Sequence, residues 1–225
     1  MDQIKMKELE QIISSKYGNT TGIVIIKDGV VSYEKYFKGC TANSCIHIYS
    51  VTKSIISILI GIALDKGYIK NIEEKVLDYF PEYKVKRREK KIQNITLRDM
   101  LTMTTPYKYR FFAPYIKYFT SSDWVKFSLD LLGGCGKIGV FRYAPLIGPD
   151  ILSGILVKAT GQSVLDFATK NLFEPLGIKV ENNLLFESKE EQLAFNQSTD
   201  ISGWVTDPMG IHAAGWGLTL TPMDM

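Results

Sequence analysis

A serine and a lysine three residues apart offer the clearest chemistry in this 225-residue chain. Ser50 and Lys53 stand at the head of an apolar stretch that continues to Leu64. Three residues make nearly one helical turn, so both side chains would project from the same face of a helix. Burial of that helix favours a neutral amine, which can take the proton of a serine hydroxyl. The spacing therefore predicts an activated nucleophile, with Lys53 as the base for Ser50.

The Ser-x-x-Lys pattern alone is a weak signal, because both residues are common and roughly one match is expected by chance in a chain of this length. It occurs twice, at Ser50/Lys53 and at Ser32/Lys35. The second copy lies in a stretch that reads as a strand, where residues three apart point to opposite faces. Only the Ser50 copy has the geometry for proton transfer.

The elements expected around this pair are a helix, a hairpin and then a helical block. An apolar stripe predicts a helix over 4–17, and two strands flank the turn residues Asp28 and Gly29, a strong hairpin signal. The nucleophile helix should run to Gly67. Further helices are expected after the caps Thr96, Ser122 and Ser163 and over 150–160, and the chain past Gly177 reads as loop and turn.

We expect one domain, 1–225, in three segments. Residues 1–48 form the N-terminal helix and hairpin of an α/β lobe, 49–200 a mainly helical lobe, and 201–225 a late loop with the start of a helix. Thr221 followed by Pro222 and Asp224 is a helix-start signal. Because no helix follows it, and because a lone hairpin is marginally stable, the sequence predicts a polypeptide that is cut short.

Composition argues against several other classes of function. Hydrophobic residues make up 45% of the chain, charged residues 23%, and the net charge is +3, which is ordinary for a globular protein. The densest basic run, 84–91, lacks the interleaved aromatics of a nucleic-acid site. The charged N-terminal segment does not resemble a signal peptide, and the longest apolar run, 55–64, is too short to span a membrane. We therefore expect a cytoplasmic protein that binds neither nucleic acid nor membrane.

Metal and cofactor motifs are weak. The three cysteines, Cys40, Cys45 and Cys135, have no metal-ligand spacing. Gly134–Gly139 spells Gly-x-Gly-x-x-Gly, but a helix is predicted before it and an extended stretch after it, the reverse of a dinucleotide site. No cofactor or metal is expected. The expected partner is a small-molecule substrate, and the oligomeric state stays open.

Two histidines raise the alternative of a Ser-His-Asp triad. No Gly-x-Ser-x-Gly elbow accompanies them, and with Lys53 one turn from Ser50 no histidine base is required. His47 is therefore interpreted as structural. His212 and Trp216 lie in a late loop and are candidates for substrate contact, although the tryptophan could equally cover the core.

Ser50-Val51-Thr52-Lys53 on an apolar helix after a hairpin resembles the serine β-lactamase and penicillin-binding-protein superfamily. The nearest branch is that of class C-type β-lactamases, cytosolic esterases and 6-aminohexanoate-dimer hydrolases. Further segments agree in order, at 66–81, 95–105, 159–178 and 204–218. The resemblance covers about residues 20–225. It implies an α+β, β-lactamase/transpeptidase-like fold: a partial antiparallel sheet flanked by helices, a helical lobe, and missing C-terminal strands.

The resemblance also implies roles for site residues. Ser50 would be the acylated nucleophile and Lys53 its proton acceptor. Tyr143 matches the tyrosine of the family's Tyr-x-Asn motif, which assists proton transfer to the leaving group and deacylation. Two departures stand out: Pro145 occupies the Asn position, and no Lys-Thr-Gly or His-x-Gly follows on a later strand. That strand supplies one oxyanion donor in the family, and losing one such donor costs roughly 100- to 1000-fold in rate.

Two functions are compatible with these observations. The first is a serine hydrolase that acts through an acyl-enzyme on an ester, amide or β-lactam carbonyl, with a cytosolic location favouring esterase or amidase chemistry. The second is a catalytically incomplete, truncated remnant that at most binds ligand.

Overall fold

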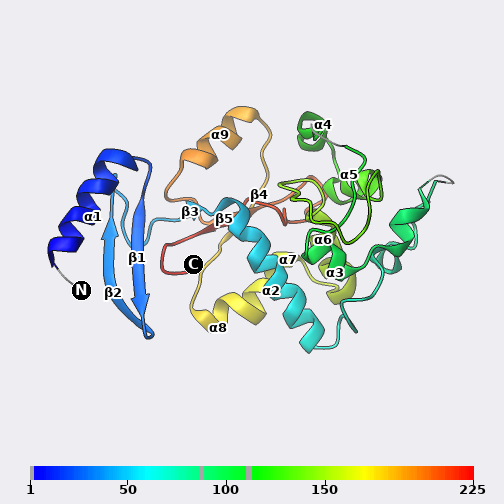
Figure 1. Cartoon of the computed structure of the whole chain (residues 1–225), viewed down its shortest axis with the longest axis horizontal. Coiled ribbons are helices and arrows are strands. Elements are labelled where there is room, and N and C mark those ends of the chain that lie inside the picture. The colour runs from blue at the N-terminus through cyan, green and yellow to red at the C-terminus, as the bar shows by residue number, and fades with distance from the viewer. Residues whose placement is uncertain (1–2, 87–88, 110–112) are drawn as a thin grey trace. The chain divides into compact units, whose positions relative to one another are not determined.

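The computed structural model describes residues 3–86, 89–109 and 113–225 (Figure 1). The basic residues Arg87 and Arg88 of the 84–91 run lie outside the described residues. The chain forms two compact units. One contains the chain up to His47 with Ser188–Ser202 and Thr219–Met225, and the other contains Ile48–Glu187 with Gly203–Leu218. No helix in the described ranges is both long enough and apolar enough to cross a membrane.

The first unit begins with the predicted helix and hairpin. Helix α1 (Gln3–Lys16) lies beside the antiparallel strands β1 (Gly22–Lys27) and β2 (Val30–Tyr36) (Figure 1). Asp28 and Gly29 both have positive φ, 53° and 77°, as a tight two-residue hairpin turn requires. The predicted hairpin is therefore confirmed, with a register shift between Ile25 and Ile26.

Polar contacts tie α1 to β2. The Tyr33 hydroxyl donates to Glu10 at 2.9 Å, and the Lys35 amine lies 3.7 Å from the same carboxylate. Ser32 Oγ instead donates weakly to the Val30 carbonyl at 3.4 Å. The second Ser-x-x-Lys copy thus has its two side chains engaged with different partners, as expected for a strand.

The remainder of the first unit is a short strand pair and one helix. Strand β3 (Ile46–His47) pairs antiparallel with β6 (Thr219–Leu220). Helix α9 (Lys189–Gln197) begins after Ser188, whose side chain accepts from the Glu191 N–H. The sequence interpretation of this region as loop is wrong, because it overlooked a Ser cap followed by acidic residues, a standard helix start.

Two sequence expectations in this unit concern single residues. His47 is 4% exposed and lies 4.8 Å from the Phe195 ring, and burial lowers its pKa to about 4. A histidine in such surroundings is neutral and structural. The helix-start residues at Thr221 make the hydrogen bonds of a cap: the Thr221 hydroxyl donates to the Asp224 carboxylate at 2.8 Å and accepts from the Asp224 N–H at 3.3 Å.

The second unit is built on three helices. Helix α2 (Thr52–Asp65) packs on α6 (Asp150–Thr160), which in turn packs on α5 (Trp124–Leu131). Helix α6 is the most buried, with its first seven residues all inside the core. Helix α2 is buried on one face only, because Ile58 remains 46% exposed.

Smaller elements complete this unit. They are the helices α3 (Leu97–Leu101), α4 (Tyr115–Phe119), α7 (Val164–Ala168) and α8 (Glu174–Leu176), the 3₁₀ turns Tyr49–Val51, Val76–Tyr79 and Lys90–Asn94, and the π turn Thr169–Phe173. Strands β4 (Asn182–Leu184) and β5 (Gly203–Val205) pair in parallel. The chain from Gly177 to Glu187 therefore contains a strand where the sequence suggested loop.

Helix caps in the second unit mostly follow the sequence. Thr96 and Ser163 accept hydrogen bonds from the backbone N–H groups of Asp99 and Asp166, as predicted. The cap of α5 is Asp123, which accepts from the Lys126 N–H at 2.7 Å, and not Ser122. Asp and Ser are equally good caps, so composition alone could not choose between neighbouring positions.

Candidate active site

The structure brings Ser50, Lys53 and Tyr143 together within the second unit. The Lys53 amine lies 2.8 Å from Ser50 Oγ, and the Tyr143 hydroxyl donates to the same oxygen at 2.9 Å. The amine also lies 5.5 Å from the centre of the Tyr143 ring, within cation–π range. Two groups predicted from separate motifs, the Lys53 amine and the Tyr143 hydroxyl, therefore converge on Ser50 Oγ.

The local backbone explains how Ser50 is presented. Ser50 lies in the 3₁₀ turn Tyr49–Val51 just before α2, not within the α-helix itself, while Lys53 is the second residue of α2. Tyr49 has a φ of 47°, uncommon for a residue with a side chain. Thr52, fully buried, donates from its hydroxyl to the Tyr49 carbonyl at 2.6 Å. The strained turn is thus fastened to the first residue of the helix.

The Lys53 amine has three oxygen partners. Besides Ser50 Oγ, it donates to the Pro145 carbonyl at 2.7 Å and to the Gly215 carbonyl at 2.6 Å. Both carbonyls can only accept hydrogen bonds. A neutral amine would place its two N–H bonds on them, leaving its lone pair directed at the Ser50 hydroxyl. The arrangement therefore orients the base toward the proton it would remove.

Burial makes that neutral form accessible. Desolvation lowers the pKa of Lys53 from 10.5 to about 8, while the negative charge of Asp150 acts in the opposite direction. Loss of hydration penalises the charged ammonium more than the neutral amine. At a pH near neutrality an appreciable share of Lys53 is therefore in the form that can accept a proton.

Tyr143 reaches Ser50 from an irregular segment. The Arg142 N–H donates to the Met103 carbonyl at 2.8 Å, and the Gly139 N–H donates to the Thr104 carbonyl at 3.0 Å. These bonds fasten the segment to the end of the α3 region. Tyr143 keeps 49% of its surface exposed, so its hydroxyl is accessible to a ligand. The Gly134–Gly139 stretch forms turns after α5.

Pro145 departs from the family motif but retains one of its contacts. An asparagine there would offer a side-chain amide to the lysine. Here the backbone carbonyl of Pro145 accepts from Lys53 instead. The acceptor is preserved, whereas the amide N–H₂ donor is lost.

The two substrate-contact candidates from the late loop are corrected. His212 is 1% exposed, bonds to Asn183 Oδ1 at 2.8 Å, and packs against Trp204 at 5.5 Å. Burial lowers its pKa to about 4. Trp216 is 5% exposed and packs 5.9 Å from Trp124. Both side chains belong to the core, so the expectation that they contact substrate is wrong, and the loop instead contributes the Gly215 carbonyl.

One buried carboxylate near the site was not recognised from sequence. Asp150, the first residue of α6, is 1% exposed. Its carboxylate accepts from the Tyr118 hydroxyl at 2.7 Å and from the Ala214 N–H at 2.9 Å. Burial raises its pKa to about 7 despite these bonds. The signal in the sequence, an acid after Pro149, reads as an ordinary first-turn residue, and nothing local reveals its burial.

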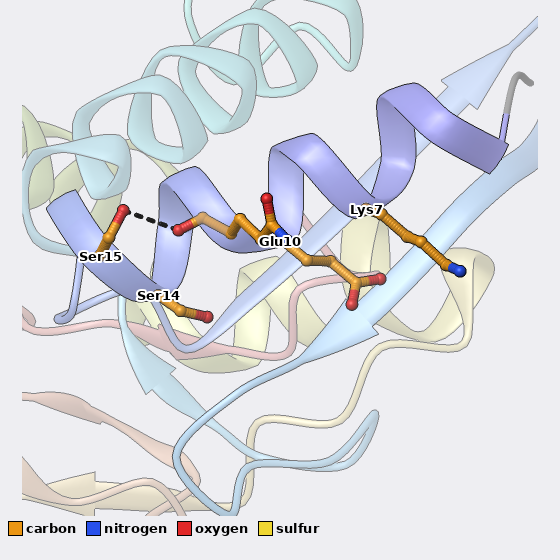
Figure 2. A pocket seen from close by; sticks show the side chains of 5 residues that line it. Lys7, Glu10, Ser14 and Ser15 are labelled. Atoms are coloured by element: carbon orange, nitrogen blue, oxygen red, sulfur yellow. Dashed lines mark hydrogen bonds between the residues drawn. The ribbon is translucent and has the colours of Figure 1, made fainter.

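A hollow in the first unit does not contain the Ser50, Lys53 and Tyr143 side chains. On α1, a shallow hollow is lined by Lys7, Glu10, Gln11, Ser14 and Ser15. Figure 2 shows these side chains along one face of the helix, with the Ser15 hydroxyl bonded to the Gln11 carbonyl at 2.7 Å. Within the described ranges, no group of three His, Cys, Asp or Glu side chains is placed to hold a metal ion.

Comparison with known proteins identifies the family. The sequence model of the β-lactamase family matches residues 10–225, so the chain belongs to the β-lactamase family. No curated protein sequence matches the chain.

Solved structures share the fold. A candidate 6-aminohexanoate-dimer hydrolase from Bacillus anthracis is 19% identical with a TM-score of 0.70, and the match covers 96% of this chain and 54% of that one. The octameric penicillin-binding protein homologue from Pyrococcus abyssi is 24% identical with a TM-score of 0.69, covering 100% and 55%. A candidate β-lactamase from Bacteroides dorei is 19% identical with a TM-score of 0.67, covering 97% and 60%.

These structures confirm the predicted β-lactamase/transpeptidase-like fold, and the family match confirms the superfamily resemblance. The chain spans between about half and three fifths of the length of these structures.

Proposed function

We propose that this protein is a serine hydrolase that acts through an acyl-enzyme on an ester, amide or β-lactam carbonyl. The observation that carries the proposal is the position of Ser50 Oγ, 2.8 Å from the Lys53 amine and 2.9 Å from the Tyr143 hydroxyl. A hydroxyl held between a base and a second proton carrier is the arrangement that nucleophilic catalysis requires.

The proposed reaction has two halves. Ser50 Oγ attacks the substrate carbonyl carbon as its proton passes to Lys53, and the C–O or C–N bond then breaks as the leaving group takes a proton through Tyr143. Water next attacks the acyl ester and gives its proton to the same groups, releasing a carboxylic acid and restoring Ser50. Backbone N–H groups in the first turn of a helix have no helical partner, and that of Ser50 is the candidate oxyanion donor.

The names of the structural neighbours support the class of substrate. One is a candidate 6-aminohexanoate-dimer hydrolase, whose name specifies an amide-linked substrate, and another is a penicillin-binding protein homologue. Both names refer to acyl compounds. On this ground we propose for this chain a substrate in which the acyl carbon is bound to a nitrogen leaving group.

Covalent labelling tests the proposal. A fluorophosphonate probe and a fluorogenic penicillin react with activated serines of this class, so at least one should modify the protein at Ser50, located by peptide mass spectrometry. Ser50→Ala should abolish the modification. Ser32→Ala is the matched control, because Ser32 begins the other Ser-x-x-Lys pattern, and it should label like the wild type.

The competing function is ligand binding without turnover. It is motivated by the absence of a Lys-Thr-Gly or His-x-Gly motif in this sequence. Folded protein that binds the penicillin reversibly but is never modified at Ser50 would support binding alone and would refute the hydrolase.

A further inference from the structure

Two contacts link a buried carboxylate to the proposed base. Asp150 accepts a hydrogen bond from the Ala214 N–H at 2.9 Å. The next residue, Gly215, presents its carbonyl to the Lys53 amine at 2.6 Å. The N–H that donates to Asp150 and the carbonyl that accepts from Lys53 therefore belong to adjacent residues.

A second route ties the same segment to Asp150. The Tyr118 hydroxyl donates to Asp150 at 2.7 Å, and it lies 3.5 Å from the indole N–H of Trp216. Tyr118 is fully buried and Trp216 nearly so. The segment 214–216 is thus connected to the carboxylate on both sides of Gly215, directly at Ala214 and through Tyr118 at Trp216.

The neighbours of this carboxylate along the chain and in space lie beside the base. A small cavity of about 30 Å³ is lined by Lys53, by Pro149 just before Asp150, and by Ala214. The other charged or titratable groups that act on Asp150 are Tyr118, Asp207 and Lys53, and Lys53 itself faces Asp150 and Tyr143. Asp150 is thus the carboxylate that acts electrostatically on the Lys53 amine.

We propose that Asp150 is a positioning residue for this site, which holds the segment carrying the Gly215 carbonyl on the Lys53 amine and supplies the negative charge that this amine faces. The inference rests on the proposed function, since positioning matters only if Lys53 serves as a base. A carboxylate at the first residue of an eleven-residue helix is also stabilised by the helix dipole. If Asp150 were purely structural, its negative charge would not matter. A substitution that removes the charge and keeps the hydrogen bonds therefore tests the proposal.

Asp150→Asn separates the charge from the hydrogen bonds. The asparagine Oδ1 can still accept from the Ala214 N–H, and its amide N–H₂ can donate to the Tyr118 hydroxyl, which rotates to accept. Asp150→Ala removes both bonds and leaves two buried donors without an acceptor. Asp207→Asn is the matched control, because Asp207 is equally buried but bonds to the N–H groups of Trp124, Met209 and Ile211.

The experiment is a titration of the Lys53 signal by NMR in protein carrying ¹³C at the lysine ε-carbon, assigned by its absence in Lys53→Arg. The midpoint should move to lower pH in Asp150→Asn and stay in place in Asp207→Asn. Between about pH 7, below which Asp150 itself becomes protonated, and the midpoint, the rate of fluorophosphonate labelling at Ser50 should rise roughly threefold for each half unit of that shift. Asp150→Ala should lower the labelling rate at every pH and lower the melting temperature.

The outcomes separate the two proposals. An Asp150→Asn midpoint that is unchanged or moves to higher pH overturns the role of Asp150, even if Ser50 labels normally. A downward shift in a protein whose wild type never labels at Ser50 supports the electrostatic link while refuting the hydrolase. Labelling by Asp150→Ala at the wild-type rate would overturn the positioning role.

Discussion

The pH dependence of Ser50 acylation tests the central proton transfer. The perturbation is pH itself, scanned from about 6 to about 10 across the lysine range. Only the neutral amine can accept the Ser50 proton, so the rate should follow the neutral fraction of Lys53. With a pKa of about 8, that fraction is roughly a tenth at pH 7, whereas an ordinary lysine pKa of 10.5 gives about one part in three thousand. Burial therefore raises the concentration of usable base by about 300-fold at pH 7.

The assay is the pseudo-first-order rate of labelling of Ser50 by a fluorophosphonate at each pH. The rate should rise about tenfold per unit of pH up to roughly pH 8 and then level off. The probe carries no titratable group in this range, so the inflection reports the protein. Lys35→Ala, in the strand copy of the motif, should leave the profile unchanged.

A profile that keeps rising to the top of the range would show that Lys53 titrates like an exposed lysine. A flat profile would show that no group titrating in this range controls acylation. Either result refutes the argument that desolvation of Lys53 activates Ser50. A fall in rate above the Lys53 midpoint would point instead to a required acid, with a different assignment of roles.

Further expectations concern the catalytic side chains and the helix glycines. Lys53→Met should slow Ser50 labelling by about 100- to 10,000-fold, the range for loss of a general base. The rates of variant and wild type are compared at the pH of the wild-type midpoint, and the variant should melt at the wild-type temperature. Tyr143→Phe should slow both formation and release of the acyl-enzyme, because the phenol carries a proton in each half of the reaction, so turnover of the fluorogenic penicillin should fall; turnover at the wild-type rate would contradict the role of the phenol. Gly61 lies on the exposed face of α2, where an added methyl group would meet nothing within 4 Å beyond its chain neighbours and the backbone of its own helix, so Gly61→Ala should stabilise the protein by about 0.5–1 kcal/mol in urea unfolding. Gly154→Ala should destabilise it, because the added carbon would lie 2.7 Å from Val125; equal effects of the two substitutions would contradict the packing of α6 on α5.

The sequence predicted the structural features that depend only on residues close together in the chain, such as the hairpin turn, the helix caps and the Ser50/Lys53 pair. The Asp28-Gly29 turn needs two residues of positive φ, and the Thr96 and Ser163 caps need only a side chain and an N–H three residues away. Ser50 and Lys53 also meet within one turn. Each of these features is fixed by geometry within a few residues, so the printed order of residues is sufficient to find it.

Features that depend on distant partners could not be predicted in the same way. Strand β4 acquires its pairing from β5, which lies beyond helix α9 in the chain, and its short polar sequence carries no alternation of apolar residues. The burial of Asp150 depends on Tyr118 and Ala214. His212 looks accessible in a loop rich in glycine, and only the packing of Trp204 and the bond to Asn183 show that it is enclosed.

The replacement of a side-chain amide by the Pro145 carbonyl has a consequence for the hydrogen bonds that this position can make. The carbonyl belongs to the main chain, so any residue at this position would keep the acceptor for Lys53. Proline has neither a side-chain donor nor a main-chain N–H. This position therefore supplies the site with a hydrogen-bond acceptor, whatever side chain replaces the proline ring, and with no donor as long as it is proline.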